Sequence, residues 1–183
     1  MNGTNMDQDK ITVLGIDPGT AIIGYAVLNF IANSNIDDIP EIVDYGAIKT
    51  AKDTRPRRLR VIHHSILSLI ERFAPQVLAV ERVFFHKNIR TAMSVGEAQG
   101  VIMLAAAQSN MEVIEYTPLQ VKETLTGYGR ASKEEIQFMV QTLFSMEHPP
   151  HPDDVADALA IAFCHISHVK SSFFYSTSLT GSN

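Results

Sequence analysis

The most constraining feature of the chain is a pair of apolar segments separated by a short turn that begins with an acid. Residues 11–16 are mostly apolar and rich in β-branched side chains, and they predict a strand buried on both faces. Asp17 and Pro18-Gly19 follow, and a second apolar run at residues 22–30 can return as an antiparallel partner. Asp17 either caps the turn or is a functional carboxylate, and the convergence of other acids decides between these interpretations.

The rest of the chain alternates helices and strands. Further strands are predicted at residues 41–49, 77–81 and 112–116, and helices at 55–73, 89–108, from 117 to a break at 127–130, 132–146 and 153–170. The first three strands form an antiparallel meander, and the last two join in parallel through crossover helices. We therefore predict an α/β domain over residues 11–170 with a five-stranded mixed sheet flanked by helices. Residues 1–10 are expected to be disordered, and 171–183 to form a flexible tail.

Composition narrows the class of protein. The 183 residues suit one domain with a full core, and no apolar run approaches the ~20 residues of a membrane span. The amino-terminal residues lack a signal-peptide pattern, and the single cysteine, Cys164, fits a reducing compartment, so a cytoplasmic location is expected. The net charge of −5 argues mildly against nucleic-acid binding, although residues 55–60 contain four arginines. This run is either a local basic patch or a solvated helix face.

Three other acids are placed where they could meet Asp17. Glu81 ends a buried strand as Asp17 does, and the carboxyl ends of parallel strands gather at one edge of a sheet. Asp154 and Asp157 share one face of the last helix. Helix capping and the helix dipole explain Asp153, and the same explanation extends to Asp154. They do not explain Asp157, whose apolar neighbours favour a functional role.

Four converging carboxylates cannot all remain ionised without a partner, and a hard divalent cation resolves the conflict. Two such ions can hold the attacking and leaving oxygens of a phosphodiester, so the pattern predicts hydrolysis by metal-activated water. His148 and His151 are spaced like metal ligands, but Pro149 and Pro150 between them favour a stiff loop. A general-acid role for His151 stays open.

An ordered set of motifs resembles the RuvC Holliday junction resolvases from about residue 11 to residue 168. The motifs are Gly15-Ile16-Asp17-Pro18-Gly19-Thr20 with Gly24-Tyr25, Val80-Glu81-Arg82-Val83-Phe84, Lys87-Asn88, Gln99-Gly100-Val101, Val121-Lys122 and Ala156-Asp157-Ala158-Leu159-Ala160. The resemblance implies a ribonuclease-H-like fold. It also implies a homodimer that binds a four-way DNA junction, in which each subunit nicks one of two strands of like polarity. A branch-migration helicase complex is a further implied partner.

The resemblance also implies roles for individual residues. Four acids fall on the family's metal ligands, with two Mg²⁺ ions expected per subunit and Mn²⁺ as a substitute. Phe84 falls on an aromatic that stacks on a base near the crossover. The helix at 89–108 falls on the dimer helix, whereas its small residues alone favour packing within one subunit. The acids are Asp17, Glu81, Asp154 and Asp157, and the implied DNA-binding residues are Phe84, Lys87, Asn88, Lys122, Lys133 and Arg82.

The chain departs from the family pattern at two positions. Arg82 stands where many relatives have Gln, which adds an expected phosphate contact. Asp153 is an additional acid, so the choice of Asp154 rests on its spacing from Asp157.

Three different functions are also compatible with parts of the pattern. An ATPase or sugar kinase of the actin type begins with Asp-x-Gly-Thr as this chain does, but it needs a second domain. A non-catalytic module could bind junctions without cutting them, although the presence of all four acids counts against it. A related nuclease could act on RNA or on another branched DNA.

Overall fold

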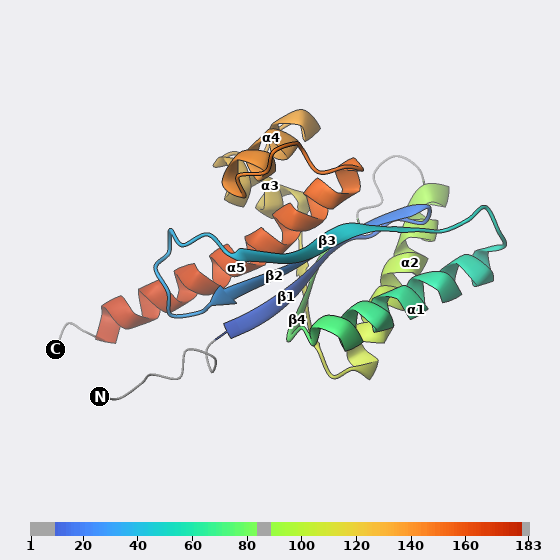
Figure 1. Ribbon diagram of the computed structural model, residues 1–183, viewed down its shortest axis with the longest axis horizontal. Helices are drawn as coiled ribbons and strands as arrows, with labels where there is room; N and C mark the ends of the chain where they lie inside the picture. The colour runs from blue at the N-terminus through green and yellow to red at the C-terminus, as the bar shows by residue number, and fades with distance from the viewer. Residues whose placement is uncertain (1–9, 84–88, 181–183) are drawn as a thin grey trace.

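The computed structural model describes residues 10–83 and 89–180 as one sheet with helices on both sides (Figure 1). The five strands and five helices in these ranges agree closely with the predicted ones. The strands are β1 (Lys10–Asp17), β2 (Ile22–Ile31), β3 (Glu41–Lys49), β4 (Val77–Glu81) and β5 (Glu112–Tyr116), and the helices are α1 (Arg55–Phe73), α2 (Ile89–Gln108), α3 (Pro118–Thr126), α4 (Lys133–Leu143) and α5 (Asp153–Thr180).

The sheet has the predicted mixed topology. Its strand order is β3-β2-β1-β4-β5, with antiparallel pairing of β1, β2 and β3 and parallel pairing of β4 with both β1 and β5. Helix α1 connects β3 to β4, which joins the sheet beside β1, and helix α2 connects β4 to its parallel neighbour β5. The carboxyl ends of β1 and β4 therefore lie next to each other at one edge.

Both faces of the central strands are covered, which explains the continuous apolar sequence of β1. Leu14 belongs to the core cluster under α1 and α2, whereas its neighbour Val13 belongs to the cluster under α3, α4 and α5. Residues 13, 14 and 16 are fully buried, as expected for a strand between two helical layers. Figure 1 shows α1 and α2 on one side of the sheet and the other three helices on the opposite side.

Two predicted helix ends are wrong. Helix α4 ends at Leu143 rather than near residue 146, because Ser145 adopts a left-handed conformation (φ 51°) and the Met146 amide returns to the Gln141 carbonyl. Helix α5 continues to Thr180, so the expected flexible tail is helical as far as that residue. Its serines are compatible with a helix because the Ser172 hydroxyl donates to the His168 carbonyl, one turn earlier.

Two further predictions concern the start of the chain and membrane-spanning helices. Strand β1 begins at Lys10, which was expected to be disordered. None of the helices in residues 10–83 and 89–180 is long and apolar enough to cross a lipid bilayer.

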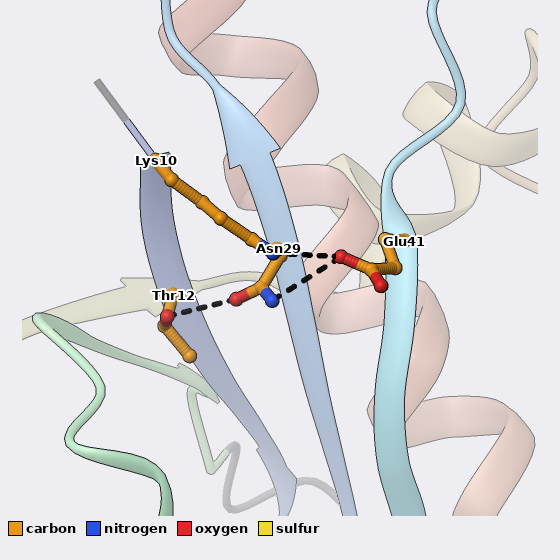
Figure 2. A network of polar contacts seen from close by, with 4 residues as sticks. All are labelled: Lys10, Thr12, Asn29 and Glu41. Carbon is orange, nitrogen blue, oxygen red and sulfur yellow. Dashed lines mark hydrogen bonds and ion pairs between the residues drawn. The ribbon is translucent and has the colours of Figure 1, made fainter. Parts of the chain in front are cut away.

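A polar network fixes the register of the meander at the end of the strands remote from Asp17. Thr12 and Asn29 are cross-strand partners, and so are Asn29 and Glu41. The Thr12 hydroxyl donates to Asn29 Oδ1 at 2.8 Å, and Lys10 Nζ and Asn29 Nδ2 both donate to Glu41 Oε2, at 2.9 and 3.4 Å (Figure 2). A slip of one residue would move every side chain to the other face. The network thus helps to keep Asp17 opposite Gly24.

Two glycines allow α5 to lie directly on the sheet. A Cβ atom on Gly24 would be 1.8 Å from the Asp154 carbonyl oxygen, and one on Gly15 would be 2.5 Å from the Ala158 carbonyl oxygen. Any larger residue would push the helix away from β1 and β2. The absence of these two side chains therefore sets the position of the first turns of α5.

We predict that Gly24→Ala destabilises the protein, because the added methyl group overlaps helix backbone, which cannot rotate away as a side chain can. The expected loss is about 1–3 kcal/mol or more, the usual cost of overpacking a core. Thermal unfolding of the two proteins measures it. An unchanged melting temperature would show that α5 does not pack on Gly24.

Candidate active site

Strands β1 and β4 place Asp17 and Glu81 side by side on the same face of the sheet. Gly15 faces α5, and side chains alternate along a strand, so Asp17 also faces α5. Ala79 pairs with Gly15 and packs in the α5 cluster, so Glu81, two residues later, points the same way. The predicted meeting of these two acids at one edge is therefore present.

Helix α5 supplies the other two acids from its first two turns. The Asp154 backbone rests on Gly24, which is the cross-strand partner of Asp17. Asp157 is three residues further along the helix and is partly buried. The negative charges of both α5 acids act on the carboxyl group of Asp17. All four predicted acids are thus brought together at the carboxyl edge of the sheet.

The pKa values of these acids record the cost of gathering them. Burial, followed by the charges of Asp157, Glu81 and Asp154, raises the pKa of Asp17 from 3.8 to about 8. Burial and the charge of Asp157 raise the pKa of Glu81 from 4.5 to about 7. Burial also raises the pKa of Asp157. Near neutral pH this cluster holds protons that isolated carboxylates would have released.

Lys133 forms ion pairs with two acids of α5. Its ammonium group lies 2.6 Å from Asp153 Oδ2 and 3.4 Å from Asp157 Oδ2. The Ser132–Glu135 capping box starts α4 and so fixes the backbone of Lys133 beside α5. Burial by itself lowers the pKa of Lys133, but the hydrogen bonds and charges of Asp153 and Asp157 together outweigh it, so the pKa is raised. Asp153, which the sequence explained only as a helix-end acid, is therefore a partner of a predicted DNA-binding lysine.

Two further polar side chains, Lys122 on α3 and Gln99 on α2, interact with Glu81 or its backbone. Lys122 Nζ donates to the Ala131 carbonyl at 2.6 Å. Its positive charge offsets part of the rise in the pKa of Glu81 that burial and Asp157 cause. Gln99 on α2 is buried and donates to Glu115 Oε1 at 3.0 Å and to the Glu81 carbonyl at 3.4 Å. In the sequence, Gln99 is recognisable only as part of the Gln99-Gly100-Val101 motif. Its position shows that it contacts the end of β4.

The turn after Asp17 is tied to α1 and β3 by contacts that the sequence did not reveal. The Thr50 hydroxyl donates to the Thr20 carbonyl at 2.7 Å, and the Thr50 amide donates to the Ala21 carbonyl at 3.0 Å. The Arg58 guanidinium donates to the same Thr20 carbonyl and, at 3.0 Å, to the Thr50 hydroxyl. These residues are far apart in sequence, so only their arrangement in the fold shows that they restrain the Asp17 turn.

The acids are not arranged as the complete ligand set of a metal ion in the described residues. Within residues 10–83 and 89–180, no three His, Cys, Asp or Glu side chains are arranged closely enough to hold one metal ion. Lys133 is already paired with Asp157. Side-chain rotation would therefore be needed before three carboxylates could meet at one ion.

The other predicted contact residues are placed only in part. Phe84, Lys87 and Asn88 lie outside the described residues. Arg82 has an exposed side chain just after β4, where its amide donates to the Tyr116 carbonyl at 2.8 Å. His151 is also exposed. Its charge lowers the pKa of Asp153, after the larger effect of the Lys133 hydrogen bond, so it lies near the start of α5.

Known proteins of one family match almost the whole folded chain. The family described as "Crossover junction endodeoxyribonuclease RuvC" matches residues 13–165. The protein of that name from Desulforamulus reducens is 50% identical over 154 residues, covering 84% of this chain and 91% of its own. A Thermus thermophilus RuvC structure is 33% identical with a TM-score of 0.79, covering 88% and 97%.

A second solved structure is described as T. thermophilus RuvC in complex with Holliday junction substrate. It is 31% identical with a TM-score of 0.76 and covers 88% of this chain and 96% of that one. The order of the strands, the four acids at one edge and these matches agree with one another. The chain belongs to the RuvC family of crossover junction endodeoxyribonucleases.

Proposed function

We propose that this protein is an endonuclease that resolves four-way DNA junctions by paired nicks, through metal-ion-assisted hydrolysis of phosphodiester bonds. The observation that supports it most directly is the convergence of four acids at one edge of the sheet in a member of this family. The junction complex of the T. thermophilus relative supports the choice of substrate. Recombination and repair are the processes in which such junctions are resolved.

The four acids fit a divalent cation by their chemistry. Carboxylate oxygens are the ligands that Mg²⁺ prefers, and the raised pKa values show that an additional positive charge would relieve the cluster. We propose Mg²⁺, two ions per subunit, with Mn²⁺ as a substitute, held by Asp17, Glu81, Asp154 and Asp157. When bound, these ions supply an activated water and stabilise the leaving oxygen.

The chain's own residues prepare the site for the scissile phosphate. Lys133 spans Asp153 and Asp157, so it can hold the charge of Asp157 while no substrate is present. An ammonium group with three donors can also pair with a phosphate, and we propose that Lys133 and Lys122 do so on the α4 side of the acids. The restraint of Thr20 by α1 and β3 keeps the Asp17 backbone in place.

Helix α2 has the surface expected of a subunit interface. Met93 and Leu104 are 55% and 51% exposed, and a Cβ atom on Gly96 or Gly100 would meet nothing within 4 Å. These four positions recur at spacings of three or four residues and therefore share one face. The open space above the glycines allows a second helix to approach closely. We propose that the protein is a homodimer joined through this face.

The remaining proposals concern contacts beyond the acids. Phe84 is proposed to stack on a base, and Lys87, Asn88 and Arg82 to contact the DNA backbone. A branch-migration helicase complex is the proposed protein partner. A cytoplasmic location is supported by the single cysteine, Cys164, which is buried and unpaired.

Cleavage of synthetic DNA tests the proposed function. A four-way junction, linear duplex and single strands are compared with Mg²⁺ and with EDTA. Paired, metal-dependent nicks in the junction alone are expected. Tight binding without nicks would favour a non-catalytic binding module. Equal cleavage of the other substrates, or a preference for RNA, would favour a different nuclease of the same fold.

We predict that Asp17→Asn and Glu81→Gln each lower the cleavage rate by about 100-fold or more, because each removes a charged ligand of the proposed ions and metal-ion catalysis supplies several kcal/mol of transition-state stabilisation, while junction binding persists. Rates on the four-way junction and binding in EDTA measure both effects. Glu147→Gln is the matched control, because its side chain is 92% exposed. Near-normal cleavage by either site variant would contradict the four-acid site.

The same Asp17→Asn variant is predicted to be more stable than the wild type without metal at high pH. The pKa of Asp17 is raised to about 8, so folding favours its protonated form, and wild-type stability falls as pH rises from about 4 through 8. Asn cannot ionise, so its advantage grows over that range and is absent below pH 4. Melting temperatures in EDTA at pH 4 and pH 9 measure it, and a variant destabilised at pH 9 would contradict the prediction.

Mg²⁺ binding is predicted to strengthen between pH 6 and pH 8. The pKa values of about 7 for Glu81 and about 8 for Asp17 mean that bound protons compete with the metal below these values. Calorimetry in buffers with different ionisation enthalpies measures both the affinity and the protons released. A pH-independent affinity with no proton release would show that these acids do not bind the ion.

We predict that Gly96→Leu weakens the dimer without unfolding the subunit, because the space around Gly96 within one chain is open. Sedimentation measures the oligomeric state, and circular dichroism the helical content. Leu119→Ala, a change at a 53% exposed apolar residue on α3, is the control. A Gly96→Leu protein that remains dimeric at the same concentration would place the interface elsewhere.

A further inference from the structure

The positive charge of this protein is concentrated in one short segment. Residues 49–60, here called the basic ledge, contain six of the chain's 15 Lys and Arg residues and one of its 20 Asp and Glu residues. The ledge therefore carries a charge of +5 in a chain whose net charge is −5. Charge alone makes it a candidate surface for a polyanion. Its location decides which polyanion could reach it.

The ledge lies at the same edge of the sheet as the four acids. Its first residue, Lys49, is the cross-strand partner of Ile22, at the start of β2. Thr50 and Arg58 both hydrogen-bond to the carbonyl of Thr20, in the turn after Asp17. Three residues of backbone span at most about 10 Å, so Thr20, to which the ledge is hydrogen-bonded, is within that distance of Asp17. Figure 1 shows the start of α1 at the same end of the molecule as the end of β1.

The arginines of the ledge have two different orientations. Arg58 is partly buried and used by the fold, because its donors meet Thr20 and Thr50. The other three arginines are exposed, and the side chains of Arg55 and Arg57 are 65% and 68% accessible. Arg57 pairs with Asp53 at 3.5 Å, and Arg55 pairs with Glu97 at 2.9 Å. Exposed ion pairs are weak, about 0–1 kcal/mol, so a phosphate can replace Asp53 at Arg57. Glu97 is only 30% exposed, so Arg55 can keep that pair and offer its remaining N–H donors to a phosphate.

Helix stability does not explain this arrangement. The first turn of α1 contains no acid, and the cap residue Thr54 makes no side-chain capping bond. Cations beside the positive end of a helix dipole are unfavourable, so the arginines reduce rather than increase the stability of α1. A bound anion would reverse that effect.

The ledge and the two lysines lie on opposite sides of the acids. Helix α1 covers one face of the sheet, whereas Lys122 on α3 and Lys133 on α4 are on the other face (Figure 1). A DNA strand whose scissile phosphate is at the acids would therefore extend in one direction over the lysines and in the other over the ledge. Each strand carries a phosphate about every 3.4 Å of helix axis, so several phosphates could reach the exposed arginines.

We propose that Arg55, Arg57 and Arg60 bind the phosphodiester backbone of the junction arm that leaves the acids on the α1 side. This inference rests on the proposed function and assigns it a second contact surface. The contacts are made by side chains to phosphate, so they contribute affinity and orientation without sequence preference. They also explain how a protein of net charge −5 binds DNA.

The test is junction binding in EDTA as a function of salt, for the wild type and for Arg55→Gln, Arg57→Gln, Arg60→Gln and the triple variant. Each substitution is expected to weaken binding roughly threefold or more. The slope of log affinity against log salt should fall by about 0.9 for every phosphate that the variant no longer neutralises. Circular dichroism checks that the variants, which change only exposed side chains, remain folded.

Arg72→Gln is the matched control. Arg72 is on the same helix, is 70% exposed and pairs with Asp44 at 3.6 Å, so it resembles Arg57 in exposure and in having an acidic partner. Fifteen residues of helix place it about 22 Å from Arg57, at the other end of α1. Its substitution is expected to leave both affinity and salt slope unchanged. Equal losses for Arg72→Gln and Arg57→Gln would reduce the ledge to a general effect of net charge.

Asp53→Asn supplies a prediction of opposite sign. Asn keeps the oxygen that accepts the Thr54 amide at 2.6 Å, but it removes the charge that pairs with Arg57. Junction binding should therefore become tighter at low salt. If the wild type binds junctions and both Asp53→Asn and the triple variant bind them equally well, the proposed role of the ledge is wrong but the proposed function is not. A wild type that does not bind junctions would overturn the proposed function as well.

Discussion

The close contact between α5 and two glycines is the constraint on which the candidate site depends. A helix normally stands away from a sheet by the length of the side chains between them. At Gly15 and Gly24 that separation is removed, and helix backbone lies on strand backbone. Asp154 and Asp157 can then reach the level of Asp17, at the end of β1, and the register of β1 with β4 adds Glu81. A conventional separation would have left the acids on two surfaces.

The gathered acids leave the site electrostatically unsatisfied. Burial and mutual repulsion favour protonated carboxyl groups on Asp17 and Glu81, and Lys133 offsets only part of the negative charge at Asp157. An arrangement of this kind is costly to the folded protein, and structural acids rarely adopt it. It is suited to a function in which cations and a phosphate arrive together, since their charges cancel and each is favoured by the presence of the other.

The same separation of charge organises the outside of the molecule. The chain is acidic overall, yet basic side chains lie on both sides of the acid cluster, as Lys122 and Lys133 on α3 and α4 and as the basic ledge at the start of α1. Thr20 connects the two systems, because the turn that follows Asp17 is held by Arg58 of the ledge. The position of the ledge and the position of the first acid are therefore set by one group of hydrogen bonds.

The sequence by itself determined the order of the elements and predicted which four acids could meet at one edge of the sheet. Apolar period, turn residues and capping residues are local signals, and a carboxylate at the end of a buried strand, as at Asp17 and Glu81, is visible in one dimension. Tertiary structure decided what depends on contacts between distant residues: the pairing of Lys133 with Asp153, the buried Gln99 behind Glu81, and the anchoring of Thr20 by Thr50 and Arg58. It also decided the end of α5, which continues to Thr180 although its last residues are rich in serine, because a helix can accommodate a serine hydroxyl such as that of Ser172 at the carbonyl one turn earlier.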